Sequence, residues 1–170
     1  MLNKVFSYFR KREAGEFTYR AASWHQACQS IVGMYIDALN DEEAAGPDIG
    51  VVLDKTDRML YQVRDHLGAL RPALNRRDRA LSKRVNKAAE RLYEVRNMTA
   101  KFLIRAQGHT PHFLRQQEMS DDAQVAYRYK AMDEVGFEAR QAAIALQTEL
   151  KDIWTILHVM VGEADELLKG

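Results

Sequence analysis

The residues best suited to chemistry in this sequence are two arginine–histidine pairs. Arg20 precedes His25 by five residues, and Arg105 precedes His112 by seven. An arginine can neutralise a phosphate while a histidine transfers a proton, so such pairs suit phosphodiester cleavage. On one helix, however, five residues turn the two side chains about 140° apart, which is a poor geometry for sharing one phosphate. Pro111 interrupts the helix that would carry the second pair.

The spacing of both pairs resembles the Arg-x(4–6)-His motif of HEPN-type ribonucleases, which are small, helical and dimeric proteins. This resemblance implies RNA cleavage as one alternative function, with Arg20, His25, Arg105 and His112 as its catalytic residues. The resemblance covers only these positions, and such a motif counts only in its structural context.

The segment between Arg71 and Arg105 is strongly basic, with eleven basic and three acidic residues. Cations along one helix can bind phosphates and release counterions. Four of the arginines recur at multiples of seven residues beside an apolar seam, where coiled coils place charges that meet a neighbouring helix. We therefore favour ion pairing within the chain, with nucleic-acid binding as the alternative. The residues that would bind nucleic acid are Arg76, Arg77, Lys83, Arg84, Lys87 and Arg91.

No metal or cofactor site is expected from the sequence. A di-iron centre in a helical bundle needs Glu-x-x-His on two helices, and no histidine here has a glutamate three residues before it. The single cysteine, Cys28, excludes an intramolecular disulfide and a cysteine-based zinc cluster. Cys28 lies on an apolar seam, which predicts that it is buried as a small apolar side chain.

Four segments carry apolar residues at alternating spacings of three and four, the coiled-coil pattern of helices packed along a seam. No stretch alternates with period two over the length of a strand, so the sequence predicts an all-α, up-down four-helix bundle. The expected helices cover about 16–40, 48–67, 76–107 and 120–168. Gly68 and Pro72 are expected to end the second helix, and Asn75 to cap the third.

The fourth helix is expected to be much longer than the others, because it would span about 73 Å as one rod. Its apolar face widens from Phe137 onward, which places this part inside the bundle. Before Gly136 the stripe is narrow, and we expect that part to pack on a second copy in a homodimer, with a fold-back at Gly136 as the alternative. The wider face adds Phe137, Ile144, Trp154, Val161 and Leu168, and the narrow stripe consists of Val125, Tyr129 and Met132.

Residues 1–15 differ from the bundle domain expected at 16–170. They place an apolar face beside a cluster of basic residues, which predicts a short amphipathic helix. We expect this arm to dock on a protein partner, with attachment to an anionic membrane surface as the alternative. The apolar face consists of Leu2, Val5, Phe6 and Phe9, and the basic residues are Lys4, Arg10, Lys11 and Arg12.

Composition limits the function classes that remain. With 170 residues, 46% apolar and 29% charged, the chain can bury a core and is not a disordered protein. It has no apolar run of the ~20 residues that a membrane span needs, and the absence of a secretory signal favours the cytoplasm. The sequence therefore predicts a non-catalytic scaffold or interaction protein that acts by self-association. Nucleic-acid binding or ribonuclease action, and peripheral membrane attachment, are the alternatives.

Overall fold

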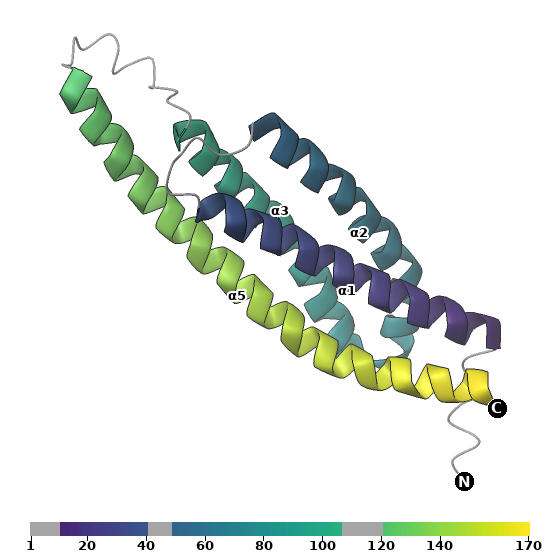
Figure 1. Cartoon of the computed structure of the whole chain (residues 1–170). Coiled ribbons are helices and arrows are strands. Elements are labelled where there is room, and N and C mark those ends of the chain that lie inside the picture. The colour runs from purple at the N-terminus through teal and green to yellow at the C-terminus, as the bar shows by residue number, and fades with distance from the viewer. Residues whose placement is uncertain (1–10, 41–48, 107–120) are drawn as a thin grey trace.

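The computed structural model describes residues 11–40, 49–106 and 121–170, with side chains at 12–40, 50–104 and 134–170. These residues form four α-helices and no strand, which confirms the predicted all-α four-helix bundle (Figure 1). Residues 1–10 of the predicted N-terminal arm, including Leu2, Val5, Phe6 and Phe9, lie outside the described residues, whereas residues 11–15 belong to the first turns of α1, where Ala14 is buried. The helices are α1 (Lys11–Leu39), α2 (Ile49–Arg77), α3 (Arg79–Ala106) and α5 (Asp121–Lys169).

Each helix runs antiparallel to its two neighbours in the bundle, in the order α1, α2, α3, α5 and back to α1 (Figure 1). Near the start of α1, the Thr18 hydroxyl donates to Asp165 near the end of α5, at 3.3 Å. Arg96 of α3 forms a bidentate pair with Asp57 near the start of α2. This up-down arrangement is what short connections between amphipathic helices favour.

The core follows the predicted seams. On α5 the buried positions recur at spacings of three and four from Ala139 to Ala164, because that spacing returns to one face of a helix. All seven predicted seam residues of α1 are buried. The seams of α2 and α3 each include one buried polar residue, Thr56 and Thr99 respectively. The α1 residues are Phe17, Ala21, Trp24, Cys28, Ile31, Tyr35 and Ala38.

The predicted end of α2 is wrong. The helix continues through Gly68 and Pro72 to Arg77, although proline cannot donate the usual backbone hydrogen bond. The last two turns bury Leu70 and Leu74 completely, and this burial outweighs the cost of the proline. Propensity signals are weak beside tertiary packing, and here packing decides where the helix ends.

The start of α3 also differs from the prediction that Asn75 is its cap. The carboxylate of Asp78 accepts a hydrogen bond of 2.9 Å from the backbone N–H of Leu81, so Asp78 is the N-cap and α3 begins at Arg79. Asn75 instead accepts a hydrogen bond from the Ser82 hydroxyl at 2.5 Å. This bond holds the last turn of α2 against the first turn of α3.

α5 is a single helix of 49 residues that continues through Gly136. The predicted fold-back at Gly136 is therefore absent from this helix. The predicted widening of its core face is wrong in part, because Phe137, Ile144 and Leu168 are 60%, 50% and 42% exposed. The two neighbouring helices, α1 and α3, do not wrap far enough around α5 to cover a third row of side chains. Trp154 is half-buried and Val161 is buried, as predicted.

In the parts of the chain that the structure describes, every helix is too polar or too short in its apolar run to span a bilayer.

Candidate functional site

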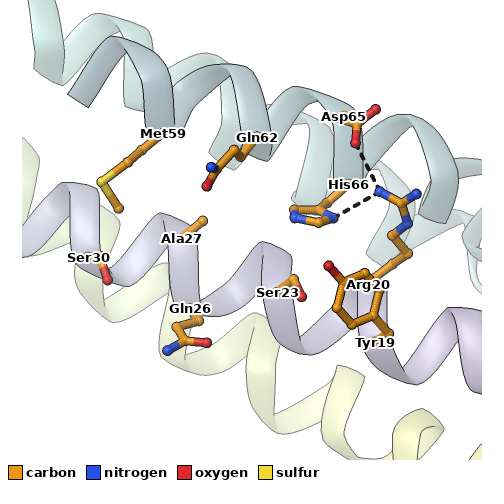
Figure 2. A pocket seen from close by; sticks show the side chains of 10 residues that line it. All are labelled: Tyr19, Arg20, Ser23, Gln26, Ala27, Ser30, Met59, Gln62, Asp65 and His66. Atoms are coloured by element: carbon orange, nitrogen blue, oxygen red, sulfur yellow. Dashed lines mark hydrogen bonds and ion pairs between the residues drawn. The ribbon is translucent and has the colours of Figure 1, made fainter. Parts of the chain in front are cut away.

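A polar groove of about 640 Å³ lies between α1 and α2 (Figure 2). On the α1 side its lining is small, since Ser23, Ala27 and Ser30 face the gap at spacings of three and four. The α2 side contributes the longer Met59 and Gln62. Small side chains opposite longer ones leave space between two helices that would otherwise interlock.

One end of this groove is closed by Arg20. Its guanidinium pairs with Asp65 at 3.0 Å and with Glu16 at 3.3 Å, and it lies 3.1 Å from Nδ1 of His66 (Figure 2). An arginine side chain has only donors, so Nδ1 of His66 accepts and the ring is neutral with its proton on Nε2. Burial, and then the charge of Arg20, lower the pKa of His66. Tyr19 packs edge-on against the same ring.

This arrangement favours neutral polar contacts over anion binding. The two carboxylates offset the charge of Arg20 and raise its pKa, so little positive potential is left for a phosphate. The rest of the lining consists mainly of hydroxyl and amide side chains. Among the described residues, no group of three or more metal-ligating side chains converges here or elsewhere.

The structure does not bring together Arg20 and His25. His25 faces α5, where its ring stacks on Trp154 with the centroids 4.4 Å apart, and burial lowers its pKa. Arg20 faces α2 instead, so the two side chains of the predicted pair belong to different interfaces, as their angular separation requires. The side chain of Arg105, and the whole of His112, lie outside the described residues.

The sequence did not predict the contact between Arg20 and His66. The two residues are 46 positions apart and on different helices. No local spacing could indicate this contact, because it depends on the register between α1 and α2.

Two arginines of the basic segment form ion pairs with α5. Arg84 makes a bidentate contact with Glu149, at 2.9 and 3.1 Å, and Arg77 lies 2.7 Å from Glu163. The hydrogen bonds from Arg84 lower the pKa of Glu149, and the nearby charge of Arg91 lowers it further. These contacts are the intramolecular pairing favoured by the sequence. The candidates that stay exposed are Arg76, Lys83 and Lys87.

α5 extends past the ends of both helices that pack against it (Figure 1). The backbone carbonyl of Leu39, the last residue of α1, accepts a 3.1 Å hydrogen bond from Arg140. The Phe102 ring, one turn before the end of α3, lies where a Cβ atom on Gly136 would meet it at 3.0 Å. The helix nevertheless continues from Gly136 back to Asp121.

The side of α5 that faces away from the bundle is apolar for an exposed helix face. Phe137, Ile144 and Val159 are 60%, 50% and 62% exposed. The same side carries the exposed uncharged residues Gln141, Thr148, Thr155 and Gly162 and the exposed charged residues Lys151 and Asp152. We call these nine residues the outer face of α5.

Cys28 is fully buried between α1 and its neighbours, as the sequence predicts. Burial raises the pKa of its thiol far above the ordinary value, because a thiolate would lose its hydration there. The groove between α1 and α2 and the outer face of α5 are two surfaces of the described part of the chain that bear on function, and a second groove of about 560 Å³ lies between α2 and α3.

No protein-family model, curated protein or solved structure matches this chain. Its function is therefore inferred from its own sequence and geometry.

Proposed function

We propose that this protein is a non-catalytic helical-bundle scaffold that self-associates through α5. The observation that carries the proposal is the length of this helix, which has 49 residues where its neighbours α1 and α3 have 29 and 28. At 1.5 Å per residue the excess amounts to about 30 Å of helix. We infer a second copy of the chain as the partner, because symmetric dimers are the commonest assemblies of soluble proteins.

The projecting part of α5 supports this proposal because a helix gains most of its stability from packing. Residues 121–133 are helical and lie beyond the point where α1 ends against Arg140. The predicted interface residues Val125, Tyr129 and Met132 fall in this stretch, and their side chains lie outside the described residues. A second copy would give these turns the neighbour that the bundle lacks.

The outer face of α5 is a second surface for self-association, on the side of the helix opposite the seam that Val125, Tyr129 and Met132 continue in the sequence. Large exposed apolar side chains are unremarkable singly, but a row of them on one helix face marks interaction surfaces. Phe137 and Ile144 lie about two turns apart on this face, and Val159 lies about four turns further along it. The groove between α1 and α2 supports catalysis less well, since its arginine is already neutralised by Asp65 and Glu16.

Light scattering at micromolar concentration tests the proposal directly. We expect the mass of a dimer for the full chain, and the mass of a monomer for the double variant Phe137→Asp with Ile144→Asp. Both residues are exposed, so these substitutions leave the bundle folded and place charges in the interface. The matched control is Tyr61→Asp, because Tyr61 is 75% exposed on α2 and away from α5. A monomeric wild-type chain would overturn the proposal.

Two further parts of the proposal follow the sequence rather than the described structure. We propose that the predicted arm docks on a protein partner through its residues 1–10, which precede α1, and that the protein acts in the cytoplasm. Removing residues 1–10 tests the first point, because it leaves α1 intact from Lys11. We expect this truncation to leave the dimer mass unchanged.

A further inference from the structure

We infer that the groove between α2 and α3 is a binding site for an amphiphilic monocarboxylate, a molecule in which one carboxylate ends an apolar chain. The groove has a volume of about 560 Å³, which is within the range of small-molecule sites between the helices of bundles. All of its lining residues that the structure describes belong to α2 or α3. The site therefore does not depend on the proposed self-association through α5.

Polar contacts between α2 and α3 close the groove at both ends. At one end Arg71 of α2 donates a 3.1 Å hydrogen bond to Asn86 of α3. At the other end, the bidentate pair of Asp57 with Arg96 lines a smaller hollow that shares Tyr93 with the groove. The two bridges are ten residues apart along α3 and fourteen along α2, which corresponds to about 15–21 Å of helix.

This closure favours a short, thin ligand over a partner helix. A helix with its side chains is about 10 Å across, so a partner helix lying along the groove would have to break both bridges. A single extended chain of limited length fits between them.

The floor between the bridges is apolar. It consists of the buried side chains of Leu60, Val63 and Leu67 on α2 and of the half-buried Ala89 on α3. Because the alanine side chain is small, α3 does not fill the space opposite these α2 residues. The Tyr93 ring, which is 45% exposed, forms the wall on the α3 side. A hydrocarbon chain lying here would be removed from water along its length, which favours binding.

The charged side chains of the lining favour an anionic head group. Two exposed arginines, Arg64 and Arg71, and one exposed glutamate, Glu90, line the groove. None of the ion pairs between described residues involves either arginine. Their charges are therefore open to a ligand, unlike that of Arg20 in the groove between α1 and α2. A guanidinium binds a carboxylate through two parallel hydrogen bonds.

The head group is expected beside Arg71, with the chain running toward Tyr93. Asn86 holds the Arg71 guanidinium at the end of the groove, so the cation loses little conformational freedom when a ligand binds. Glu90 lies one helical turn from Asn86 in the direction of Tyr93. Its charge disfavours a second anion further along the groove. One cationic end and an apolar remainder match a molecule with a single anionic head.

Isothermal titration calorimetry of the full chain with octanoate tests this site. We expect saturable binding, with acetate and 1-octanol each binding at least about tenfold more weakly, because each lacks one half of the ligand. Decanoate should bind about tenfold more tightly than octanoate, since two further methylene groups lie on the apolar floor. A negative heat-capacity change should accompany binding, because apolar surface is buried.

Variants locate the binding in this groove. Ala89→Leu fills the floor and Arg71→Gln removes the cation for the head group, and each is expected to weaken octanoate binding about tenfold. Glu90→Gln removes a repelling charge and should strengthen binding about threefold. The matched controls are Ala69→Leu and Arg58→Gln, which change exposed residues of α2 outside the groove and should bind as wild type does.

Circular dichroism of the same samples checks that each variant keeps its helices. If Ala89→Leu unfolds the bundle, the two glutamine variants in the groove still test the site, because both change exposed side chains. Octanoate that does not saturate, a folded Ala89→Leu variant that binds like wild type, or a Glu90→Gln variant that binds more weakly would each overturn the inference. The light-scattering mass of wild type is measured separately, so such a failure leaves the proposed self-association standing.

Discussion

The two sides of α1 differ in how they meet their neighbours. Into the core the helix presents Trp24, Cys28 and Ile31, all fully buried, and on the α5 side His25 stacks on Trp154. Toward α2 it presents Ser23 and other small side chains, and a groove remains. The same helix thus makes a sealed interface and an open one. The difference teaches that side-chain size along each face, rather than the bundle topology, determines where a surface can form.

The largest effect is expected from removing bulk on the sealed side. Leu150→Ala on α5 deletes a fully buried side chain and should lower the free energy of unfolding by about 3 kcal/mol, through lost burial and the cavity left behind. Ser30→Ala in the open groove should change it by less than about 0.5 kcal/mol. Urea unfolding of both variants measures the contrast. Similar losses would mean that the groove side is packed as closely as the core.

A smaller contrast is expected between two helical glycines. Gly68 has no atom within 4 Å of a Cβ position, whereas a Cβ on Gly136 would lie 3.0 Å from the Phe102 ring. Gly68→Ala should therefore stabilise the protein by about 0.5–1 kcal/mol, because alanine has the higher helix propensity. Gly136→Ala should gain less than this or destabilise, since the ring must move.

Thermal unfolding compares the two glycine variants, and Phe102→Leu serves as the background that relieves the contact at Gly136. In that background Gly136→Ala should recover the gain seen at Gly68. An equal gain from both alanines in the wild-type background would show that Phe102 does not limit the approach of α3 to α5.

The smallest effect is the pH dependence of stability from the two histidines beside α1. Burial lowers the pKa of His25 and of His66 below the ordinary 6.5. At pH values just below 6.5 these histidines therefore bind more protons in the unfolded chain than in the folded chain. Their contribution to stability is therefore complete above about pH 6.5 and is lost as the pH falls through it.

Urea midpoints at about pH 7 and about pH 5 measure this loss. His25→Phe keeps a ring on Trp154 and should flatten the pH dependence, and His66→Gln should flatten it further. The shifted carboxyl groups do not interfere, because arginine contacts hold the pKa values of Asp57 and Glu149 below their ordinary 3.8 and 4.5. A double variant that keeps the full slope would show that other groups are responsible.

The sequence predicts the core of this protein better than the ends of its helices. The seam from Phe17 to Ala38 follows from spacing alone, since burial repeats with the helical period. Gly68 and Pro72 predict the end of α2 incorrectly, because Leu70 and Leu74 are buried by packing against other helices, which a local signal does not carry. Local propensities are small compared with the free energy of burying two leucines.

For the basic segment, the sequence indicated what kind of side chain the arginines meet, but not which individual residues. It predicted that arginines beside the seam meet acidic side chains, and Arg77 and Arg84 do so. It did not indicate the contact of Arg20 with His66, nor that Phe137 and Ile144 face away from the core. Both depend on how far the neighbouring helices wrap around a given face.

By itself the sequence determined the helical class and the seams, because these depend on periodicity and on the chemistry of neighbouring residues, whereas the continuity of the fourth helix through Gly136 came from the structure. Only the tertiary structure decided which arginine meets which histidine and which apolar side chains stay in water. The physical reason is that register and wrapping arise from side chains of several helices fitting together, and no single segment carries that information.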